Sequence, residues 1–252
     1  MQSPNECFKV VKKDYLKFLN KEKIFGESKT KKTTILKNIY IPTSFWIEKK
    51  YKKKGKTLFL GISGGQGSGK TTTAGILKII LKKFFKRRVS VTSIDDFYKT
   101  LHDRERMSKN IHPLFITRGV PGTHEVNLIK IFFRKIKRKN FNKFQIPKFD
   151  KSIDDRLEKK NWTRINSKPE IVILEGWCVG AKPQLNHLIK KPINELERNE
   201  DKKYIWRKYV NKKLKDEYKK IFSMIDDFIF IKIPNFKMVF KWRLLQENKL
   251  KE

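Results

Sequence analysis

The chain has 252 residues, which suits one α/β domain or one domain with an appendage. Its 61 basic residues outnumber 26 acidic ones, so the net charge is +35, a value typical of nucleic-acid-binding proteins. Hydrophobic residues make up 38% and include 19 Phe, enough for a core, which excludes disorder throughout the chain.

The first part of the chain predicts a helical extension before an α/β domain. Residues 1–48 show short apolar patches typical of irregular helices and loops, and residues 48–56 form a charged connector. An apolar run over residues 57–63 predicts a buried strand, and a glycine-rich turn and a helix over about 70–85 follow it. We therefore expect an N-terminal extension over residues 1–56 and a second domain over residues 57–252.

Strands and helices alternate along the rest of the chain. Further strands are predicted over residues 89–94, 171–174 and 228–233, and helices over 124–139, 206–222 and 239–249. Residues 102–123 contain prolines and glycines and predict a looser region. Such alternation is typical of a three-layer α/β/α fold with a mostly parallel sheet that helices cover on both faces.

The positive charge consists mainly of lysine. The chain holds 49 Lys and 12 Arg, and the lysines are scattered. Readers of nucleic acid rely on Arg for bidentate contacts, so this profile indicates a compositional bias, and we expect no nucleic-acid partner. The densest runs, residues 49–56 and 134–139, are interpreted as solvated faces. The positive field still favours small anionic ligands.

Other sequence features limit the cellular location of the protein and the kinds of site that it can form. No apolar run reaches the ~18 residues that cross a bilayer, and the N-terminus lacks the apolar segment of a secretory signal, so we expect no membrane association. Cys7 and Cys178 are too few and too far apart for a disulfide framework or a zinc site. We expect a cytoplasmic protein, and the oligomeric state stays open.

A phosphate-binding loop follows the first predicted strand of the sheet. The motif G-x-x-x-x-G-K-[ST] is matched in full by Gly64, Gly65, Gln66, Gly67, Ser68, Gly69, Lys70 and Thr71, with Thr72 next to it. Glycines let successive backbone N–H groups turn toward phosphate oxygens, and the helix that follows adds its positive end. Lys70 is expected to reach the β- and γ-phosphates of ATP, and the Thr71 hydroxyl to bind Mg²⁺.

Two other predicted strands end in acidic residues. Asp95 follows the second strand and Glu175 ends the third. Ligands of open α/β sheets gather at the carboxyl ends of strands, and phosphoryl transfer needs a carboxylate for the proton of the attacking hydroxyl and others for Mg²⁺. We assign the proton to Asp95, and Mg²⁺ to Thr71, Asp95 and Glu175. The alternative for Asp95 is a turn or helix cap.

These motifs resemble a known group of kinases. The loop followed by Ser93-Ile94-Asp95-Asp96-Phe97-Tyr98 resembles the uridine kinase, phosphoribulokinase and pantothenate kinase group of P-loop kinases. Three further segments resemble plant-type D-glycerate 3-kinases and their microbial relatives, namely residues 118–125 (RGVPGTHE), 146–152 (IPKFDKS) and 175–180 (EGWCVG). The resemblance covers roughly residues 57–247. It implies transfer of the ATP γ-phosphate to the 3-hydroxyl of D-glycerate, a photorespiratory step in photosynthetic relatives.

The segments that carry the resemblance also supply candidate substrate ligands. A small carboxylate with two hydroxyls needs cationic and hydrogen-bonding partners. The candidates are Arg118, His124, Lys148, Asp150 and Lys151. Each has a structural alternative: Arg118 would pair with a surface acid, for example, and His124 would simply begin a basic helix. Trp177 is expected to pack in the core.

The resemblance also implies a lid. In related kinases an Arg in the segment after the fourth strand touches ATP phosphates, and Arg243 is the matching residue. The family continues further past this segment, so we expect an incomplete lid. The alternatives to a glycerate kinase are a kinase of uridine, pantothenate or a sugar phosphate, a basic P-loop ATPase that binds nucleic acid, and a catalytically silent ATP-binding remnant.

Overall fold

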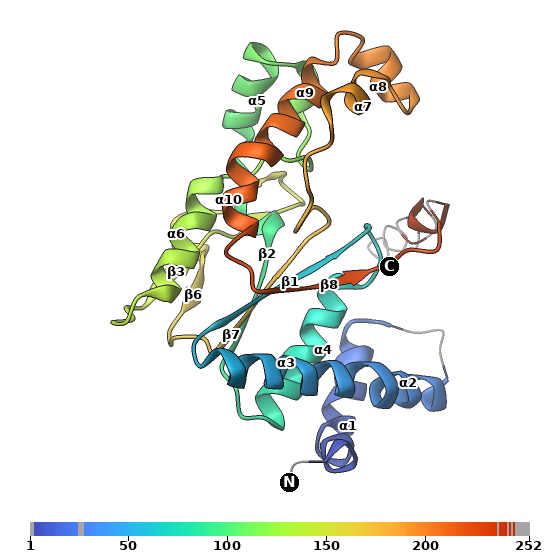
Figure 1. Ribbon diagram of the computed structural model, residues 1–252, viewed down its shortest axis with the longest axis vertical. Helices are drawn as coiled ribbons and strands as arrows, with labels where there is room; N and C mark the ends of the chain where they lie inside the picture. The colour runs from blue at the N-terminus through green and yellow to red at the C-terminus, as the bar shows by residue number, and fades with distance from the viewer. Residues whose placement is uncertain (1–2, 25–27, 236, 241, 243, 245–252) are drawn as a thin grey trace. The chain divides into compact units, whose positions relative to one another are not determined.

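The computed structural model describes residues 3–24, 28–235, 237–240, 242 and 244 (Figure 1). The chain divides into two compact units. The first consists of Met1–Thr92, Ser167–Trp177 and Asp226–Glu252, and the second of Ser93–Asn166 and Cys178–Ile225. The phosphate-loop motif lies in the first unit, and all five predicted substrate residues lie in the second.

The first unit combines a sheet with the N-terminal helices. Its elements are α1 (Pro4–Lys21), α2 (Lys29–Ile35), η1 (Leu36–Tyr40), α3 (Ile41–Lys54), β1 (Leu58–Gly64), α4 (Lys70–Lys83), β2 (Val89–Ser93), β7 (Ile171–Glu175) and β8 (Asp227–Ile231). The strand order is β2-β7-β1-β8, and β1 runs parallel to both β7 and β8. The predicted parallel sheet is therefore confirmed. Parallel pairing brings the ends of β1 and β7 to one edge of the sheet, with Ile62 opposite Glu175.

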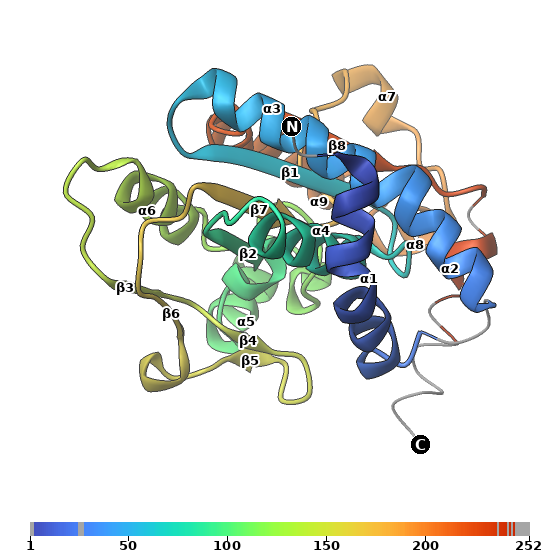
Figure 2. The same cartoon turned by 90° about the horizontal axis from the view of Figure 1, so that it is seen from below.

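One hydrophobic core joins the N-terminal helices to this sheet. Fully buried side chains come from each layer, for example Val11 of α1, Ile47 of α3, Leu77 of α4 and Leu60 of β1. Figure 2 shows α1, α3 and α4 beside the sheet. The predicted helical extension is thus part of the packing of the first unit. The apolar residues of α1 recur at helical spacing, and burying this face offsets the entropic cost of ordering the helix.

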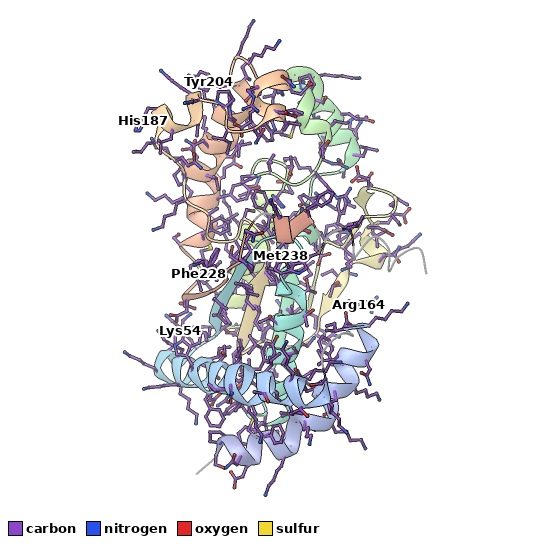
Figure 3. The ribbon with its side chains drawn as sticks, turned by 90° about the vertical axis from the view of Figure 1, so that its right-hand side faces the viewer. Lys54, Arg164, His187, Tyr204, Phe228 and Met238 are labelled. Atoms are coloured by element: carbon purple, nitrogen blue, oxygen red, sulfur yellow. The ribbon has the colours of Figure 1, made fainter. Side chains whose placement is uncertain are left out.

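The N-terminal helices extend further than the sequence predicts. The charged connector expected over residues 48–56 is largely the last part of α3, which ends at Lys54 before Gly55 in a left-handed conformation. Its lysines lie on the solvated face, and Ile47 and Glu48 lie on the buried one. Lys54 forms an ion pair with Asp226, next to the edge strand β8; Figure 3 labels Lys54 and, on β8, Phe228.

The second unit is built from shorter elements. They are η2 (Ile94–Phe97), α5 (Leu101–Asn110), η3 (Pro113–Ile116), α6 (Val126–Lys137), β3 (Phe144–Ile146), β4 (Phe149–Asp150), β5 (Asp155–Arg156), η4 (Lys159–Asn161), β6 (Thr163–Ile165), α7 (Asn186–Lys190), α8 (Glu195–Glu200), α9 (Ile205–Lys213), η5 (Leu214–Tyr218) and α10 (Lys219–Phe222). Strands β4 and β5 form an antiparallel hairpin, and β3 pairs with β6. Figure 3 shows His187 of α7 and Tyr204, just before α9, at one end of this unit.

Two helical predictions for the second unit have different outcomes. The apolar stripe of α6 is confirmed, because Ile129, Phe132 and Phe133 are buried. The looser region predicted over residues 102–123 is wrong in its first half, where α5 forms. The buried residues of α5 are Arg104 and Met107, so the helix lacks the apolar periodicity that would have revealed it.

The predicted last helix, over residues 239–249, falls largely outside the described residues. The described part of that segment is helical at residues 237–240. Among the described helices, none is long and apolar enough to cross a membrane.

Candidate active site

The glycine-rich motif forms the loop between β1 and α4. Gly67 and Gly69 have φ angles of 73° and 84°, which residues with a Cβ atom rarely adopt, and Gly69 caps the start of α4. A Cβ atom added to Gly67 would lie 2.6 Å from Cβ of Trp242. The backbone therefore requires glycine at these two positions, and the loop has the left-handed turns that point N–H groups at an anion.

The side chains of this loop are placed to meet phosphate. Lys70 lies at the first turn of α4, and its Nζ donates to the Gly65 carbonyl at 2.8 Å, so the ammonium group lies across the loop. The Ser68 hydroxyl is buried and has no hydrogen-bond partner in the described structure. A buried polar group without a partner is costly, and a phosphate oxygen would satisfy it. The loop thus fits the phosphates of a nucleoside triphosphate.

Two of the predicted Mg²⁺ ligands are in contact. The Thr71 hydroxyl donates to Glu175 Oε1 at 3.2 Å, from the first turn of α4 to the end of β7. Glu175 is buried, and its neighbour Gly176 donates its N–H to the Ile62 carbonyl, which fixes the end of β7 beside β1. No group of three or more potential His, Cys, Asp or Glu metal ligands occurs among the described residues. This donor set fits Mg²⁺, which keeps waters and phosphate oxygens as its other ligands.

Asp95 begins a separate cluster in the second unit. It lies in η2, directly after β2, and its N–H is held by the Ser93 hydroxyl at 3.3 Å. Lys151 Nζ lies 2.7 Å from Asp95 Oδ2. Burial acts to raise the pKa of Asp95, but the charge and hydrogen bond of Lys151, with smaller contributions from His124 and Tyr98, outweigh it and lower the pKa. Asp95 is therefore ionised near neutral pH.

A second, parallel pair lies beside the first. Lys148 Nζ is 3.1 Å from Asp96 Oδ1, and the same oxygen accepts from the Phe149 N–H at 3.4 Å. The hairpin of β4 and β5 thus places both predicted lysines against consecutive aspartates. Sequence reasoning noted Asp96 but gave it no role, since a contact between residues so far apart in the chain leaves no local pattern.

His124 is buried and neutral. Only 1% of it is exposed, its ring stacks on Tyr98 with 4.4 Å between ring centres, and Nδ1 lies 2.6 Å from the Tyr218 hydroxyl. Burial lowers the pKa of His124 to about 4, against the opposing effect of Asp95. The residue lies two positions before α6 begins at Val126, whereas the predicted helix began at His124 itself. Its predicted contact with substrate stays a prediction, and a neutral imidazole is the form that would make it.

Arg118 and Asp150 already have protein partners. Arg118 forms an ion pair with Asp154 through Nη1, and its guanidinium lies over the Phe149 ring. Asp150 Oδ1 accepts from both the N–H and the hydroxyl of Ser152, and these bonds lower its pKa. Asp150 therefore shapes the hairpin turn, and its predicted role toward a substrate hydroxyl stays a prediction.

The remaining predicted residues have simpler outcomes. Arg243 lies outside the described residues. The prediction that Trp177 packs in the core is wrong, because it is 40% exposed, two residues past the end of β7. The carbonyl of Trp177 accepts from the Ser63 hydroxyl at 3.3 Å, so its backbone is tied to the end of β1.

A cavity of about 270 Å³ within the second unit is lined in part by His124. Its lining includes Lys99, Lys130 and Lys213. Lys99 pairs with Glu125 at 3.0 Å, and Lys213 pairs with Glu217. Both carboxylates also line the cavity, so its charge is nearly balanced.

Comparisons with known proteins give a consistent result. The sequence model described as the Phosphoribulokinase / Uridine kinase family matches residues 59–208. The chain is 34% identical over 214 residues to the uncharacterized kinase mug58 of Schizosaccharomyces pombe, covering 82% of this chain and 76% of that protein. It is 28% identical over 234 residues to the chloroplastic D-glycerate 3-kinase of Arabidopsis thaliana, covering 86% of this chain and 49% of that protein.

A solved structure extends this similarity to the fold. D-glycerate 3-kinase from Cryptococcus neoformans superposes with a TM-score of 0.72 at 26% sequence identity. The superposition covers 85% of this chain and 80% of that one.

Proposed function

The chain belongs to the phosphoribulokinase/uridine kinase family and is an ATP-dependent kinase, and we propose that its acceptor is D-glycerate, with 3-phosphoglycerate as product. The observation that carries this proposal is the pairing of the hairpin lysines with consecutive aspartates, beside an arginine suited to a carboxylate. A nucleoside acceptor would need an aromatic stacking surface, whereas this cluster consists of lysine and arginine side chains paired with aspartates. The D-glycerate 3-kinases among the relatives support the same acceptor.

We infer that the loop and helix α4 hold the nucleotide. The backbone N–H groups around Gly67 and Gly69 would surround the phosphates, and Lys70 would move from the Gly65 carbonyl to a phosphate oxygen. The residues from Gly64 to Thr72 supply this part of the site. Thr71 and Glu175 would hold Mg²⁺, which supplies charge neutralisation of the transferring phosphoryl group.

Asp95 would act on the acceptor hydroxyl. As an ionised carboxylate it would accept the hydroxyl proton while the oxygen attacks the γ-phosphorus and the bond to ADP breaks. Lys151 keeps Asp95 ionised, and its ammonium group would neutralise the developing phosphoryl charge. Arg118 retains guanidinium donors beyond the one given to Asp154, and these would bind the acceptor carboxylate.

We also propose that the enzyme works in a reducing compartment, the cytoplasm. Cys7 and Cys178 are both buried thiols that form no disulfide. Burial raises the pKa of the Cys7 thiol to about 11, so this thiol is unreactive.

The product distinguishes this function from its neighbours. The protein is incubated with Mg-ATP and either D-glycerate or L-glycerate, and the product is identified by phosphorus NMR. We expect phosphorylation at the 3-hydroxyl of the D-isomer. Phosphorylation at the 2-hydroxyl, or equal turnover of both isomers, would contradict the proposed acceptor geometry.

A further inference from the structure

Arg104 is a buried cation that touches none of the predicted substrate residues directly. Its side chain has no exposed surface and lies on α5, the helix that sequence reasoning missed. Burying a guanidinium costs free energy unless it is paired and hydrogen-bonded, so the partners of Arg104 indicate its structural role.

The partners of Arg104 come from two separate segments. Nη1 donates to the Ile116 carbonyl at 2.6 Å, two residues before Arg118. Nη2 donates to the Asp154 carbonyl and lies 3.0 Å from the Asp154 carboxylate. One side chain therefore fastens the loop that carries Arg118 to the hairpin turn that carries Lys151. We name the three residues Arg104, Asp154 and Arg118 the arginine clamp.

Asp154 is the centre of the clamp. Its φ angle is 53°, a left-handed conformation that costs free energy for a residue other than glycine and is held only when its surroundings fix it. Its carboxylate forms an ion pair with Arg104 through Oδ2 and accepts from Arg118 through Oδ1. Because two guanidinium groups share one carboxylate, the clamp keeps a net positive charge.

Neighbouring contacts fix the same turn. Asp155 Oδ1 accepts the N–H of Leu101, the first residue of α5, at 2.9 Å. Arg156 donates through Nη2 to the Tyr98 carbonyl at 2.6 Å. Asp154 at the end of the turn and both residues of β5 are thus tied to α5 or to the segment after Asp95. This leaves the turn little freedom, and it sets the position of Lys151.

We propose that Arg104 is a positioning residue which, through Asp154, holds Arg118 ready to bind the carboxylate of the acceptor. This inference rests on the proposed function. Arg118 is fixed by Asp154 Oδ1 and by the Phe149 ring, and its other guanidinium donors remain for a ligand. An arginine fixed in advance loses less side-chain entropy on binding, so the clamp contributes selectivity for a carboxylate over a neutral acceptor.

The main test variant is Asp154→Asn. Asn tolerates the left-handed conformation, and the side chain is 39% exposed, so the fold should persist. Arg104→Lys keeps the positive charge but loses the two guanidinium nitrogens that bond the Ile116 and Asp154 carbonyls at the same time. Arg106→Lys is the matched control, since Arg106 lies on the same helix, is exposed and pairs with Asp103.

The first readout is hydrogen exchange, which does not depend on the substrate. In Asp154→Asn and Arg104→Lys, amides of residues 116–120 and 150–156 should exchange faster, while Arg106→Lys should match the wild type. Unchanged exchange in both segments would overturn the clamp. This readout decides that point even if the wild-type enzyme does not phosphorylate D-glycerate, which would contradict the proposed function alone.

The second readout is the ratio of kcat/KM for D-glycerate to kcat/KM for the neutral D-glyceramide. Loss of a positioned, charge-assisted contact should lower this ratio roughly tenfold or more in Asp154→Asn. A general loss of stability would lower both values together and leave the ratio unchanged. An unchanged or increased ratio, with faster exchange, would overturn the role of the clamp in carboxylate selection.

Discussion

Lys151 and Asp95 form an ion pair in which Nζ lies 2.7 Å from Oδ2, although the two residues are 56 positions apart in the chain. Asp95 follows β2, and Lys151 lies in the turn of the β4–β5 hairpin. The pair opposes the effect of burial on the carboxylate and keeps Asp95 ionised. A charged carboxylate in this position is suited to accept the proton of an attacking hydroxyl.

Replacing Asp95 by Asn should remove this base. We expect turnover to fall roughly 100- to 10,000-fold, the usual contribution of a general base, while the Kd for ATP stays close to wild type. Asp216→Asn, at an exposed acid that pairs with Lys212, is the matched control. Steady-state kinetics and ATP titration measure the two effects. Equal loss of turnover and ATP binding would contradict the assignment.

Replacing Lys151 by Met should shift the pH dependence of the reaction. Removing the ammonium leaves burial, which raises the pKa of Asp95, so the carboxylate is protonated at a higher pH. The acidic limb of kcat/KM should therefore move to higher pH. Lys148→Met is the comparison, because Lys148 pairs with Asp96 and should leave the limb in place. A limb that does not move in Lys151→Met would show that Asp95 does not set it.

His124 should make the fold sensitive to acid. Its pKa is about 4 in the folded protein and about 6.5 unfolded, so between these values the unfolded chain binds the extra proton. Its contribution to stability is full above about pH 6.5 and is lost as the pH falls toward 4. At pH 5 the loss should be about 2 kcal/mol.

The measurement is urea unfolding at about pH 7.5 and about pH 5, for the wild type and for His124→Asn. The Asn side chain keeps a polar atom close to the position of Nδ1, so the Tyr218 hydroxyl retains a partner, but Asn cannot take up the proton. The drop in unfolding free energy should be smaller in the variant. Equal drops would mean that His124 is not the buried neutral group.

Gly67→Ala should damage the phosphate loop. The position has φ of 73°, and the new Cβ would meet Trp242 at 2.6 Å. We expect weaker ATP binding together with lower stability. Gly55→Ala is the control, with φ of 65° and nothing within 4 Å, so it should cost roughly 1 kcal/mol of stability and leave ATP binding unchanged. Matching ATP affinities in the two variants would contradict the role of the loop.

Local patterns made part of this structure predictable. The loop from Gly64 to Thr71 follows from its own sequence, because its chemistry is contained in eight consecutive residues between a strand and a helix. The parallel sheet follows from apolar runs such as Ile171–Glu175. The apolar stripe of α6 gave that helix for the same reason.

Other features depend on contacts that no local pattern reveals. Helix α5 buries the charged side chain of Arg104. The sequence alone predicts an exposed residue there, because its burial depends on partners such as the distant Ile116 carbonyl. Asp154 lies in an unremarkable run of polar residues, and its two arginines are 50 and 36 residues away. The last part of α3 is lysine-rich because one face is solvated, which sequence reasoning interpreted as a connector.

The central claim is tested most directly by ADP release from the wild-type protein with Mg-ATP and one acceptor at a time. The acceptors are D-glycerate, uridine, pantothenate and ribulose 5-phosphate. We predict that kcat/KM for D-glycerate exceeds kcat/KM for each other acceptor by at least about 100-fold, since a site that positions the hydroxyl of a small carboxylate rejects acceptors of another size or charge. No response to D-glycerate, with turnover of another acceptor, would contradict the account.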